Sequence, residues 1–524
     1  MCIDITDAKY DYLAELAAKP DKARRCHELA GYPLQEYSAM PNSYRNIFMS
    51  DRDRILYCKS FLRLSGKTQV YSPSTSDHQR TRLTHTLEVS QIARTISQAL
   101  RLNCDLTEAI ALGHDIGHTP FGHAGEEILH EIMSPKNENN HNAPKRTTIY
   151  NLDGNEIDTY KPLYGFKHNL QSVRCLVEDL ESRRNLYGLN LTNYTLWGIM
   201  HHSSLVYKEG KVKTEYLIPY FYEKYENYCN NQLQSPAWTF EALVVAEADE
   251  IAQMHHDLED AIRKKAMTKE KVIEILLKLS PLMCKTDLDT LKDIEKQKWV
   301  PREYLISKTS KIIVNTLVTA LISASAENLY TLITRSLTSK DDDEDKIKNK
   351  IKTEAEKILR RSYNDLEIAN AIQYDVYSSN AEQPNKDIIR DFQDKIATAV
   401  INTFDVQRSD SKGQYIIKNL FEAYYTNPQQ LPDSALKNLY KILKEDNYLF
   451  KLDVPAEDKT ANTKDFFDIE SDMLRAIINK AVEDIRDNNN LDKRRDILIM
   501  RIICDYISGM TDSFAINEYE KLYG

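Results

Sequence analysis

Glycine is scarce in this chain, and its scarcity is the feature that most restricts the fold. Only 14 of 524 residues are glycine, which is few for a β-rich or doubly wound α/β protein with many tight turns. Apolar residues recur instead at intervals of four or five between positions 83 and 100, at Leu83, Leu87, Ile92, Ile96 and Leu100. Because this spacing keeps side chains on one side of a helix, the sequence predicts an all-α protein.

Further helices are expected along the first half of the chain. The segment Asp105-Leu-Thr-Glu108 has the pattern of a capping box and predicts a helix start, and Gly117 and Pro120 predict the end of that helix. Other helices are expected at about 121–133, 168–186, 192–203, 216–233 and 238–265.

The polar, turn-rich segment 134–165 interrupts this helical pattern. It predicts an irregular excursion with at most a short hairpin around Asp153-Gly154. Helical periodicity returns after it and continues through 263–524, so a large helical region is expected to follow the first half.

Charge and hydropathy exclude several classes of protein. The net charge of −10 argues against a generally basic nucleic-acid surface, but it permits a local cationic pocket for a phosphate-rich small molecule. No window approaches the roughly 18 apolar residues of a membrane span, and the first residues, MCIDITDAKYDYLAEL, lack the pattern of a signal peptide. The eight cysteines form no CxxC pair. We therefore expect a cytoplasmic protein with reduced thiols and no membrane segment.

Histidine is confined to one part of the chain. Twelve of the 13 histidines lie between residues 78 and 256, and residues 257–524 contain none. Any chemistry that needs imidazole is therefore predicted in the first half.

The stretch HDIGHTPFGH at 114–123 predicts a metal site. His114 and Asp115 are adjacent metal-capable side chains near a helix end, while His85 and Asp249 interrupt the apolar stripes of two other helices. Alternatively, His85 is a satisfied core histidine and Asp249 a buried hydrogen-bonded carboxylate. Together the four would supply two nitrogen and two oxygen ligands and leave positions open for water and substrate.

Five ordered blocks resemble a known family. They are RLSGKTQVY (63–71), RTRLTHTLEVSQIART (80–95), ALGHDIGHTPFGHAGEEIL (111–129), GFKHNLQSVR (165–174) and ADEIAQMHHDLEDAI (248–262). They are similar to the deoxyguanosinetriphosphate triphosphohydrolases, which belong to the HD-domain metal-dependent phosphohydrolases. The resemblance implies an N-terminal helical segment with a nucleoside-contacting block in 1–77, an HD-domain helical core in 78–262 and an elaborating helical C-terminal region in 263–524.

The resemblance also implies roles for the site residues. His85, His114, Asp115 and Asp249 match the family's metal ligands. His123 and Glu126 match its catalytic histidine and glutamate, and their spacing of three puts them on one helix face, where the carboxylate can orient the imidazole. The alternative for this pair is a surface ion pair at a helix start.

Substrate contacts follow from the same blocks. His118, His168 and Arg82 match positions that reach the phosphates, although Arg82 alone could equally face solvent. Lys67 and Gln69 match the block that approaches the nucleoside, Asp257 matches an aspartate near the sugar, and Asn169 and Gln171 lie beside His168. This chain departs from its relatives at Ser65, where they often carry glutamine, and at Gln253, where they often carry tyrosine.

The activity implied is hydrolysis of a deoxynucleoside triphosphate, dGTP first, to the deoxynucleoside and tripolyphosphate. A divalent Mn, Mg, Co or Fe ion would serve as cofactor. The alternatives are another HD phosphohydrolase, acting on a cyclic dinucleotide, a nucleotide or an alarmone, and a regulatory dNTP-binding protein with weak catalysis. Some relatives form hexamers and respond to dNTPs or single-stranded DNA, so a homo-oligomer and such an effector are expected.

Overall fold

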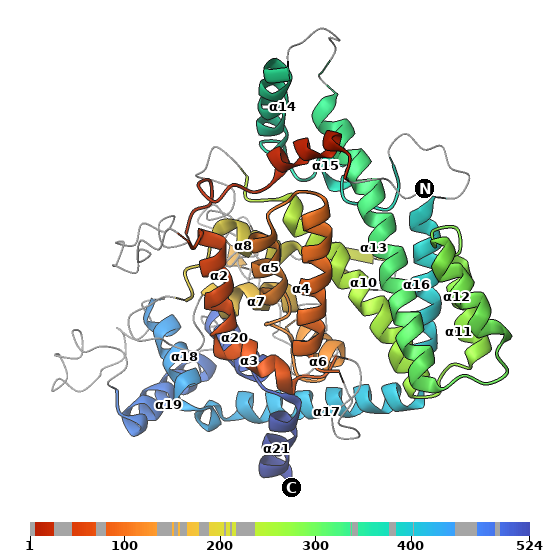
Figure 1. Cartoon of the computed structure of the whole chain (residues 1–524). Coiled ribbons are helices and arrows are strands. Elements are labelled where there is room, and N and C mark those ends of the chain that lie inside the picture. Colours follow the sequence, from red (N-terminus) through yellow and green to blue (C-terminus); the bar gives the residue numbers. More distant parts are fainter. Residues whose placement is uncertain are drawn as a thin grey trace.

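Helices make up nearly all of the regular structure, as the scarcity of glycine predicted (Figure 1). The computed structural model describes residues 6–25, 44–69, 80–133, 149–150, 156–157, 165–177, 188–203, 206–209, 212–215, 236–335, 337, 344–376, 384–401, 403–445, 469–487 and 493–524. Strands within these ranges form two two-stranded sheets. The predicted all-α class is confirmed.

In the described part of the histidine-containing region, four helical elements precede residue 82 and six more follow, five of which carry histidines. Their bounds are η1 (Ala8–Leu16), α2 (Ile47–Leu56), α3 (Lys59–Arg63), η2 (Leu64–Gly66), α4 (Arg82–Ala99), α5 (Cys104–Gly113), α6 (Gly122–Ile132), α7 (His168–Val177), α8 (Asn193–His201) and α10 (Phe240–Arg263). The remainder of the expected helix 168–186 beyond residue 177, and the expected helix 216–233, lie outside the described residues.

Helix α5 begins earlier than its sequence predicted. Asn103 caps the helix, and its side-chain oxygen accepts hydrogen bonds from the backbone N–H groups of Asp105 at 3.1 Å and Leu106 at 3.2 Å. The predicted capping box at Asp105–Glu108 was wrong, because Asn103 already satisfies the free N–H groups of the first turn. Helix α4 does open with a capping box, formed by Thr81 and Thr84.

Two short hairpins accompany the helices. Strands β1 (Ile149–Tyr150) and β2 (Glu156–Ile157) pair antiparallel where a hairpin was expected, although Asp153 and Gly154 lie outside the described residues. Strands β3 (Val206–Glu209) and β4 (Val212–Glu215) form a second antiparallel hairpin. This second hairpin was not predicted, since the sequence analysis allowed only one hairpin, in 134–165.

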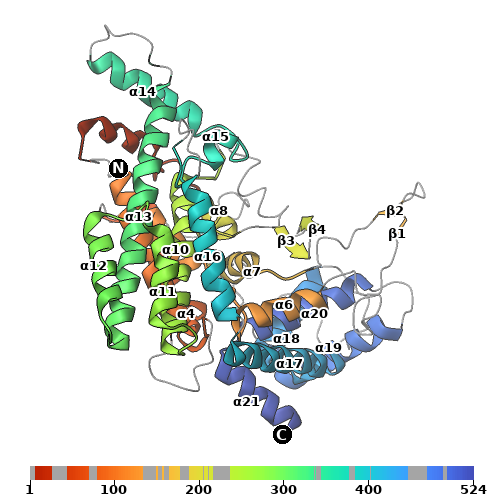
Figure 2. The same cartoon turned by 90° about the vertical axis from the view of Figure 1, so that its right-hand side faces the viewer.

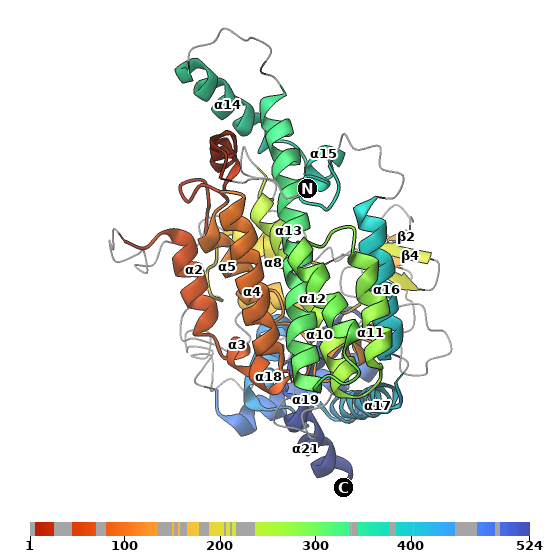
Figure 3. The same cartoon turned by 45° about the vertical axis from the view of Figure 1, so that its right-hand side comes forward.

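The larger of two apolar cores surrounds α10. Helices α4, α5 and α8 pack on one side of α10, and α13 and α16 pack on the other (Figures 1 and 3). The buried members of this core run from Tyr10 to Val406, so the expected boundary at residue 262 falls inside it. The later helices of this part are α11 (Lys269–Leu276), η6 (Leu277–Leu279), α12 (Lys285–Lys296), α13 (Arg302–Thr334), α14 (Glu344–Ile358), α15 (Leu366–Ala369) and α16 (Asn385–Ile401).

Helix α13 is long and apolar enough to cross a membrane by composition alone. Its most apolar 18-residue window has a mean hydropathy of 1.4, and 67% of that window is buried inside the protein. Because α13 packs along α10, its apolar surface is accounted for by the core of the fold.

The smaller core is built by the last helices together with α6. Helix α17 packs on α6, α20 and α21, and in Figure 2 it lies below α6, with α21 beneath it. Leu129 and Phe166 contribute to this core from the first half of the chain. The helices concerned are α17 (Phe404–Thr426), η7 (Pro428–Gln430), α18 (Asp433–Glu445), α19 (Ser471–Asp487), α20 (Lys493–Ser508) and α21 (Asp512–Tyr523).

Candidate metal and phosphate site

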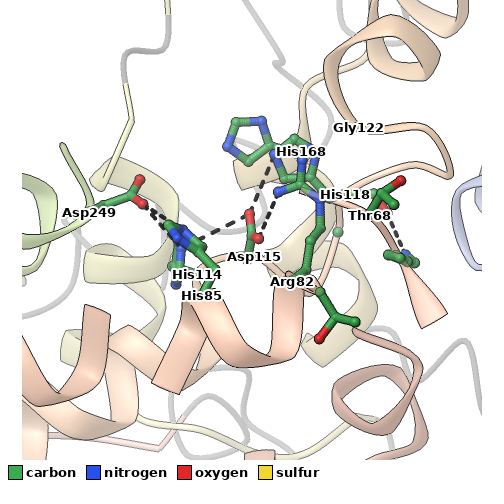
Figure 4. A network of polar contacts seen from close by, with 12 residues as sticks. Thr68, Arg82, His85, His114, Asp115, His118, Gly122, His168 and Asp249 are labelled. Atoms are coloured by element: carbon green, nitrogen blue, oxygen red, sulfur yellow. Dashed lines mark hydrogen bonds and ion pairs between the residues drawn. The ribbon is translucent and has the colours of Figure 1, made fainter. Parts of the chain in front are cut away.

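Three helices bring the four predicted metal ligands together. His85 lies in the first turns of α4, Asp249 lies within α10, and His114 and Asp115 follow the end of α5. Asp249 Oδ1 is 2.9 Å from His85 Nε2 and 3.7 Å from His114 Nε2, and the ligand atoms of His85, His114 and Asp115 lie within 4.8 Å of one another. Figure 4 shows Asp115 between this group and the side chains of Arg82 and His118.

The His114 ring is held in an orientation that suits a ligand. Its Nδ1 lies 2.6 Å from the carbonyl oxygen of Ala111, which places the proton on Nδ1 and leaves the lone pair of Nε2 facing the two carboxylates. This Nε2 is buried and has no hydrogen-bond partner among the described residues. Burial opposes protonation, but Asp249 and Asp115 outweigh it and raise the pKa of His114 to about 9. The negative field that attracts a proton there would also attract a metal cation.

The turn that carries His114 and Asp115 is fixed against α7. The Ser172 hydroxyl accepts from the backbone N–H of Gly117 at 2.8 Å and donates to the carbonyl oxygen of His114 at 2.7 Å. A Cβ on Gly117 would lie 2.1 Å from the backbone nitrogen of Ser172. Glycine is therefore required at 117, because the turn approaches the α7 backbone too closely for a side chain.

Asp115 joins the ligand group to a cationic group. Its Oδ2 accepts from Arg82 Nη1 at 2.7 Å, and its Oδ1 is 3.4 Å from His118 Nε2. Burial opposes ionisation of Asp115, but Arg82 and the surrounding histidines outweigh it and hold the pKa of this carboxyl well below its usual value. Asp115 is therefore a carboxylate that contacts both halves of the site.

Two of the three nitrogens of the Arg82 guanidinium lack a hydrogen-bond acceptor among the described residues. The side chain is 2% exposed, and its Nε and Nη2 have no hydrogen-bond partner among the described residues. Its Nη2 lies beside Gly122, which has a φ of +59° and whose Cβ, if present, would approach it to 3.1 Å. Buried guanidinium N–H groups without acceptors favour an anionic ligand, so the solvent-facing alternative for Arg82 is excluded.

Glu126 makes a different contact from the one expected. Its Oε2 accepts from the backbone N–H of His168 at 3.3 Å and lies 2.6 Å from His168 Nδ1. The expected orienting hydrogen bond to His123 is not formed among the described contacts, although ligand atoms of His118, His123 and Glu126 lie within 4.8 Å of one another. The reason is that Glu126 faces the first turn of α7, whose N–H groups have no partners within that helix.

The electrostatics of Glu126 and the histidines near it also favour His168 as the partner of Glu126. Burial opposes ionisation of Glu126, but His168 and His123 outweigh it and lower its pKa to about 2. The rings of His118 and His168 stack with centroids 4.0 Å apart. Burial, together with the Arg82 cation, holds the pKa of His118 well below its usual value. A neutral His118 can therefore accept or donate a hydrogen bond.

The predicted nucleoside contacts are arranged less uniformly. Lys67 is 1% exposed, and its Nζ donates to the backbone carbonyls of His118 and, at 2.8 Å, of Ser508; burial lowers its pKa to about 7. Gln69 Oε1 is buried without a partner among the described residues. Ser65 is exposed and donates to the carbonyl of Leu62 at 2.8 Å.

The remaining predicted contacts lie on α7 and α10. Asn169 donates to the Met200 carbonyl at 2.8 Å, and Gln171 donates to Asp505 at 2.9 Å, so both amides serve the packing of α7. Gln253 and Asp257 are partly exposed on α10, and burial with nearby acidic groups raises the pKa of Asp257 to about 7.

Helices α20 and α21 contribute residues that sequence reasoning missed. Asp512 accepts from the Thr68 backbone N–H at 3.2 Å and from its hydroxyl, and from the Phe121 backbone N–H at 3.1 Å. Asp505 accepts hydrogen bonds from Arg174 Nε at 2.7 Å and from Arg174 Nη2 at 2.5 Å. Asp512 therefore joins the segments that precede α4 and α6, and Asp505 anchors α7. No local pattern marks these carboxylates, because their partners lie more than 300 residues away.

Histidines outside the predicted set complete the surroundings of the site. His202 Nε2 is 3.3 Å from His168 Nε2, and His202 forms a potential ligand group with His114 and Asp249. Another potential ligand group is formed by Glu88, His255 and His256. The paired histidines at 201–202 and 255–256 were the available signal.

This donor set suits a divalent first-row metal ion. It combines imidazole nitrogens with carboxylate oxygens, includes the unpartnered Nε2 of His114, and opens to solvent through Asp249, whose side chain is 23% exposed. Beyond Asp115, the unpartnered N–H groups of Arg82 provide an adjoining anion site. A metal ion beside an anion site is the arrangement needed to hydrolyse a phosphate ester.

Comparison with known proteins agrees with this geometry. Residues 82–273 match the HD domain, and residues 477–521 match the phosphohydrolase-associated domain. A deoxyguanosinetriphosphate triphosphohydrolase-like protein of Bartonella henselae is 31% identical over 484 residues, covering 92% of this chain and 90% of its own. Proteins of that description from Rickettsia rickettsii and Geobacter sulfurreducens are 30% and 27% identical, with 97% and 95% of each chain covered.

The HD domain implies a divalent metal ion, which the histidine and aspartate clusters fit. The chain is an HD-domain phosphohydrolase, and it belongs to the deoxyguanosinetriphosphate triphosphohydrolase-like family.

Proposed function

We propose that this protein hydrolyses deoxynucleoside triphosphates, dGTP foremost, to the deoxynucleoside and inorganic tripolyphosphate. The observation that carries the proposal is the position of Asp115, which contacts the Arg82 guanidinium at 2.7 Å and belongs to the His85–His114 ligand group. A phosphate held by Arg82 would therefore lie next to a metal ion held by that group. The names of the full-length relatives support the triphosphate substrate.

His85, His114, Asp115 and Asp249 would hold the metal ion. When bound, the ion would polarise a phosphate oxygen and lower the pKa of a nearby water. Mn, Co and Fe suit a mixed nitrogen and oxygen donor set better than Mg, which prefers oxygen ligands.

The side chains beyond Asp115 would bind the triphosphate and handle protons. Arg82 offers Nε and Nη2 to phosphate oxygens, and the neutral His118 ring adds a hydrogen bond. His123 is the most exposed histidine of the group, so we assign it the proton transfer to or from the attacking water or the leaving 5′ oxygen. Glu126 acts first on His168, which it contacts at 2.6 Å, and through that ring holds the neighbouring His118 in place.

The direct test is a matrix of all four dNTPs against Mg, Mn, Co and Fe ions, with tripolyphosphate as the readout. Tripolyphosphate release with dGTP as the best substrate supports the proposal. Orthophosphate from nucleoside monophosphates, pyrophosphate from an alarmone, or opening of a cyclic dinucleotide would instead favour another HD phosphohydrolase. Saturable dNTP binding with negligible turnover under every metal would favour a regulatory binding protein.

Two variants test the residue roles. We expect His114→Ala to abolish metal-dependent tripolyphosphate release, since it removes a ligand. We expect Glu126→Ala to lower turnover by about 10²-fold or more while the protein retains its metal. Full activity of His114→Ala would overturn the site, and loss of metal from Glu126→Ala would contradict the division of roles.

Base selectivity and assembly extend the proposal. Ser65 and Gln253 replace the residues that relatives often carry near the nucleoside. The rate of tripolyphosphate release is therefore compared among all four dNTPs. A homo-oligomer, up to a hexamer, and activation by dNTPs or single-stranded DNA are tested by light scattering and by assays with mixed dNTPs or added oligonucleotide. Release of tripolyphosphate from every dNTP at equal rates would refute the preference for dGTP.

A further inference from the structure

A series of three hydrogen-bonded polar side chains begins at His85 on the side away from Asp249, buried at the two histidines and partly exposed at its carboxylate end. His85 Nδ1 is 3.2 Å from His256 Nδ1, and His256 Nε2 hydrogen-bonds Glu88 Oε2. Glu88 is on α4, one turn after His85, and His256 is on α10, which also carries Asp249. Two packed helices thus supply both the ligand and the groups behind it.

The donors and acceptors of these three side chains allow one arrangement of protons. A His85 ring that offers its Nε2 lone pair to a metal must carry its proton on Nδ1, and that proton can only be donated to His256 Nδ1. His256 must then carry its own proton on Nε2, where Glu88 accepts it. Every hydrogen bond in this series points from the ligand toward the carboxylate.

We propose that His256 and Glu88 are positioning residues for His85, holding it in the tautomer and orientation that bind the metal ion. The inference rests on the proposed role of His85 as a ligand. Outer partners of this kind typically change metal affinity 10–100-fold when removed. The His85 and His256 side chains are 2% and 1% exposed, so water has little access to the hydrogen bond between them, whereas the Glu88 side chain is 37% exposed.

A second metal ion at Glu88, His255 and His256 is the competing explanation. Each of these groups already has a partner in the protein. Arg80 Nη2 lies 3.3 Å from Glu88 Oε1 and would repel a cation there, and His256 Nδ1 is directed at His85. The contacts therefore favour a hydrogen-bonded support over a second metal site.

The experiment measures Mn²⁺ and Co²⁺ binding to the full-length chain without nucleotide, by isothermal titration calorimetry and by the Co²⁺ absorption spectrum. We expect His256→Phe and Glu88→Ala each to weaken binding 10–100-fold at unchanged stoichiometry. Because His256 and Glu88 both act through the His85 ring, their effects should not add. The double variant should bind the metal ion at most about threefold more weakly than the weaker-binding single variant. His256→Gln, which can accept from His85 and donate to Glu88, should recover most of the affinity.

His255→Gln is the matched control. His255 also contacts Glu88, at 3.1 Å, but it has no contact with His85 among those described, so its replacement should change affinity less than threefold. Glu88→Met, which has no carboxylate or amide acceptor, carries the test if Glu88→Ala does not fold. In every folded variant, activity should return at saturating Mn²⁺, which a general structural defect would not allow.

Unchanged metal affinity in folded His256→Phe and in the folded Glu88→Ala or Glu88→Met would overturn the inference. So would the loss of one of two bound ions, which would indicate a second metal site, or an equal effect of His255→Gln. A protein that binds Mn²⁺ with the expected variant pattern but releases no tripolyphosphate would refute the proposed function and leave this inference intact.

Discussion

The two apolar cores of this protein differ in how they treat polar side chains. Within the described residues, the larger core, around α10, encloses seven buried histidines, at His85, His114, His118, His168, His202, His255 and His256. The described parts of helices α17–α21, which build most of the smaller core, bury far fewer polar side chains. Buried ionisable groups destabilise a fold unless they are paired, so the larger core carries the chemistry at a cost in stability that the smaller core does not bear.

The few buried polar residues of the smaller core connect it to the larger core. In the described part of α17–α21, the buried polar residues are Asp505, Ser508 and Asp512, and each contacts the larger core. Asp505 holds Arg174, the Ser508 carbonyl holds Lys67, and Asp512 holds Thr68. The C-terminal region is therefore apolar inside and polar only where it supports the site.

The largest expected effect comes from breaking this polar interface. Asp505→Ala should lower the free energy of unfolding by about 3–5 kcal/mol, because it leaves the Arg174 cation buried without its main partner. Urea denaturation measures the change. The double variant Arg174→Met with Asp505→Leu should recover most of it, and a double variant as unstable as the single would show that the charges themselves are not the cause.

A cavity in the smaller core should reduce stability without changing the metal site. Leu420 is fully buried in α17, so Leu420→Ala should cost about 3 kcal/mol in the same denaturation assay. Leu366→Ala is the control, since Leu366 is 78% exposed and should change stability by less than about 0.5 kcal/mol. If Leu420→Ala also weakened Mn²⁺ binding tenfold, the two cores could not be regarded as separate in function.

Metal binding should stabilise the two cores unequally. At about 100 times its dissociation constant, Mn²⁺ should add about 2.7 kcal/mol to the stability of the region that binds it. Hydrogen exchange should therefore slow in α4, α5 and α10, which carry the ligands, and change little in α18 and α19. If Mn²⁺ slowed hydrogen exchange equally in both cores, and a chelator reversed the effect, the expected difference between the two cores would be contradicted.

The smallest expected effect is a dependence of stability on pH that comes from a histidine of the larger core. Burial lowers the pKa of His201 to about 4, below the roughly 6.5 of an unfolded chain. The unfolded state therefore binds the extra proton between pH 6.5 and 4, and stability falls as pH falls through that window, by about 2 kcal/mol at pH 5. Denaturation of His201→Gln from pH 8 to 5 should show a shallower decline; an unchanged slope would remove His201 as a cause.

The sequence predicted the helices and polar residues of the larger core better than it predicted the contacts that hold them in place. Helix spacing predicted α4 and α10, and the polar residues on their apolar stripes, His85 and Asp249, do meet at 2.9 Å. The partner of Glu126 was missed, because a spacing of three on α6 says nothing about α7, which approaches that face. The capping of α5 was misplaced by two residues because Asn103 precedes the pattern that was recognised.

The sequence by itself determined that the protein is helical and which residues could bind a metal ion, since periodicity and side-chain chemistry are local properties. The tertiary structure decided which of those residues act on one another. Glu88 and His256 are 168 residues apart, and Thr68 and Asp512 are 444 apart. Such contacts depend on the rotation and crossing of packed helices, which side-chain packing sets and helical periodicity leaves open.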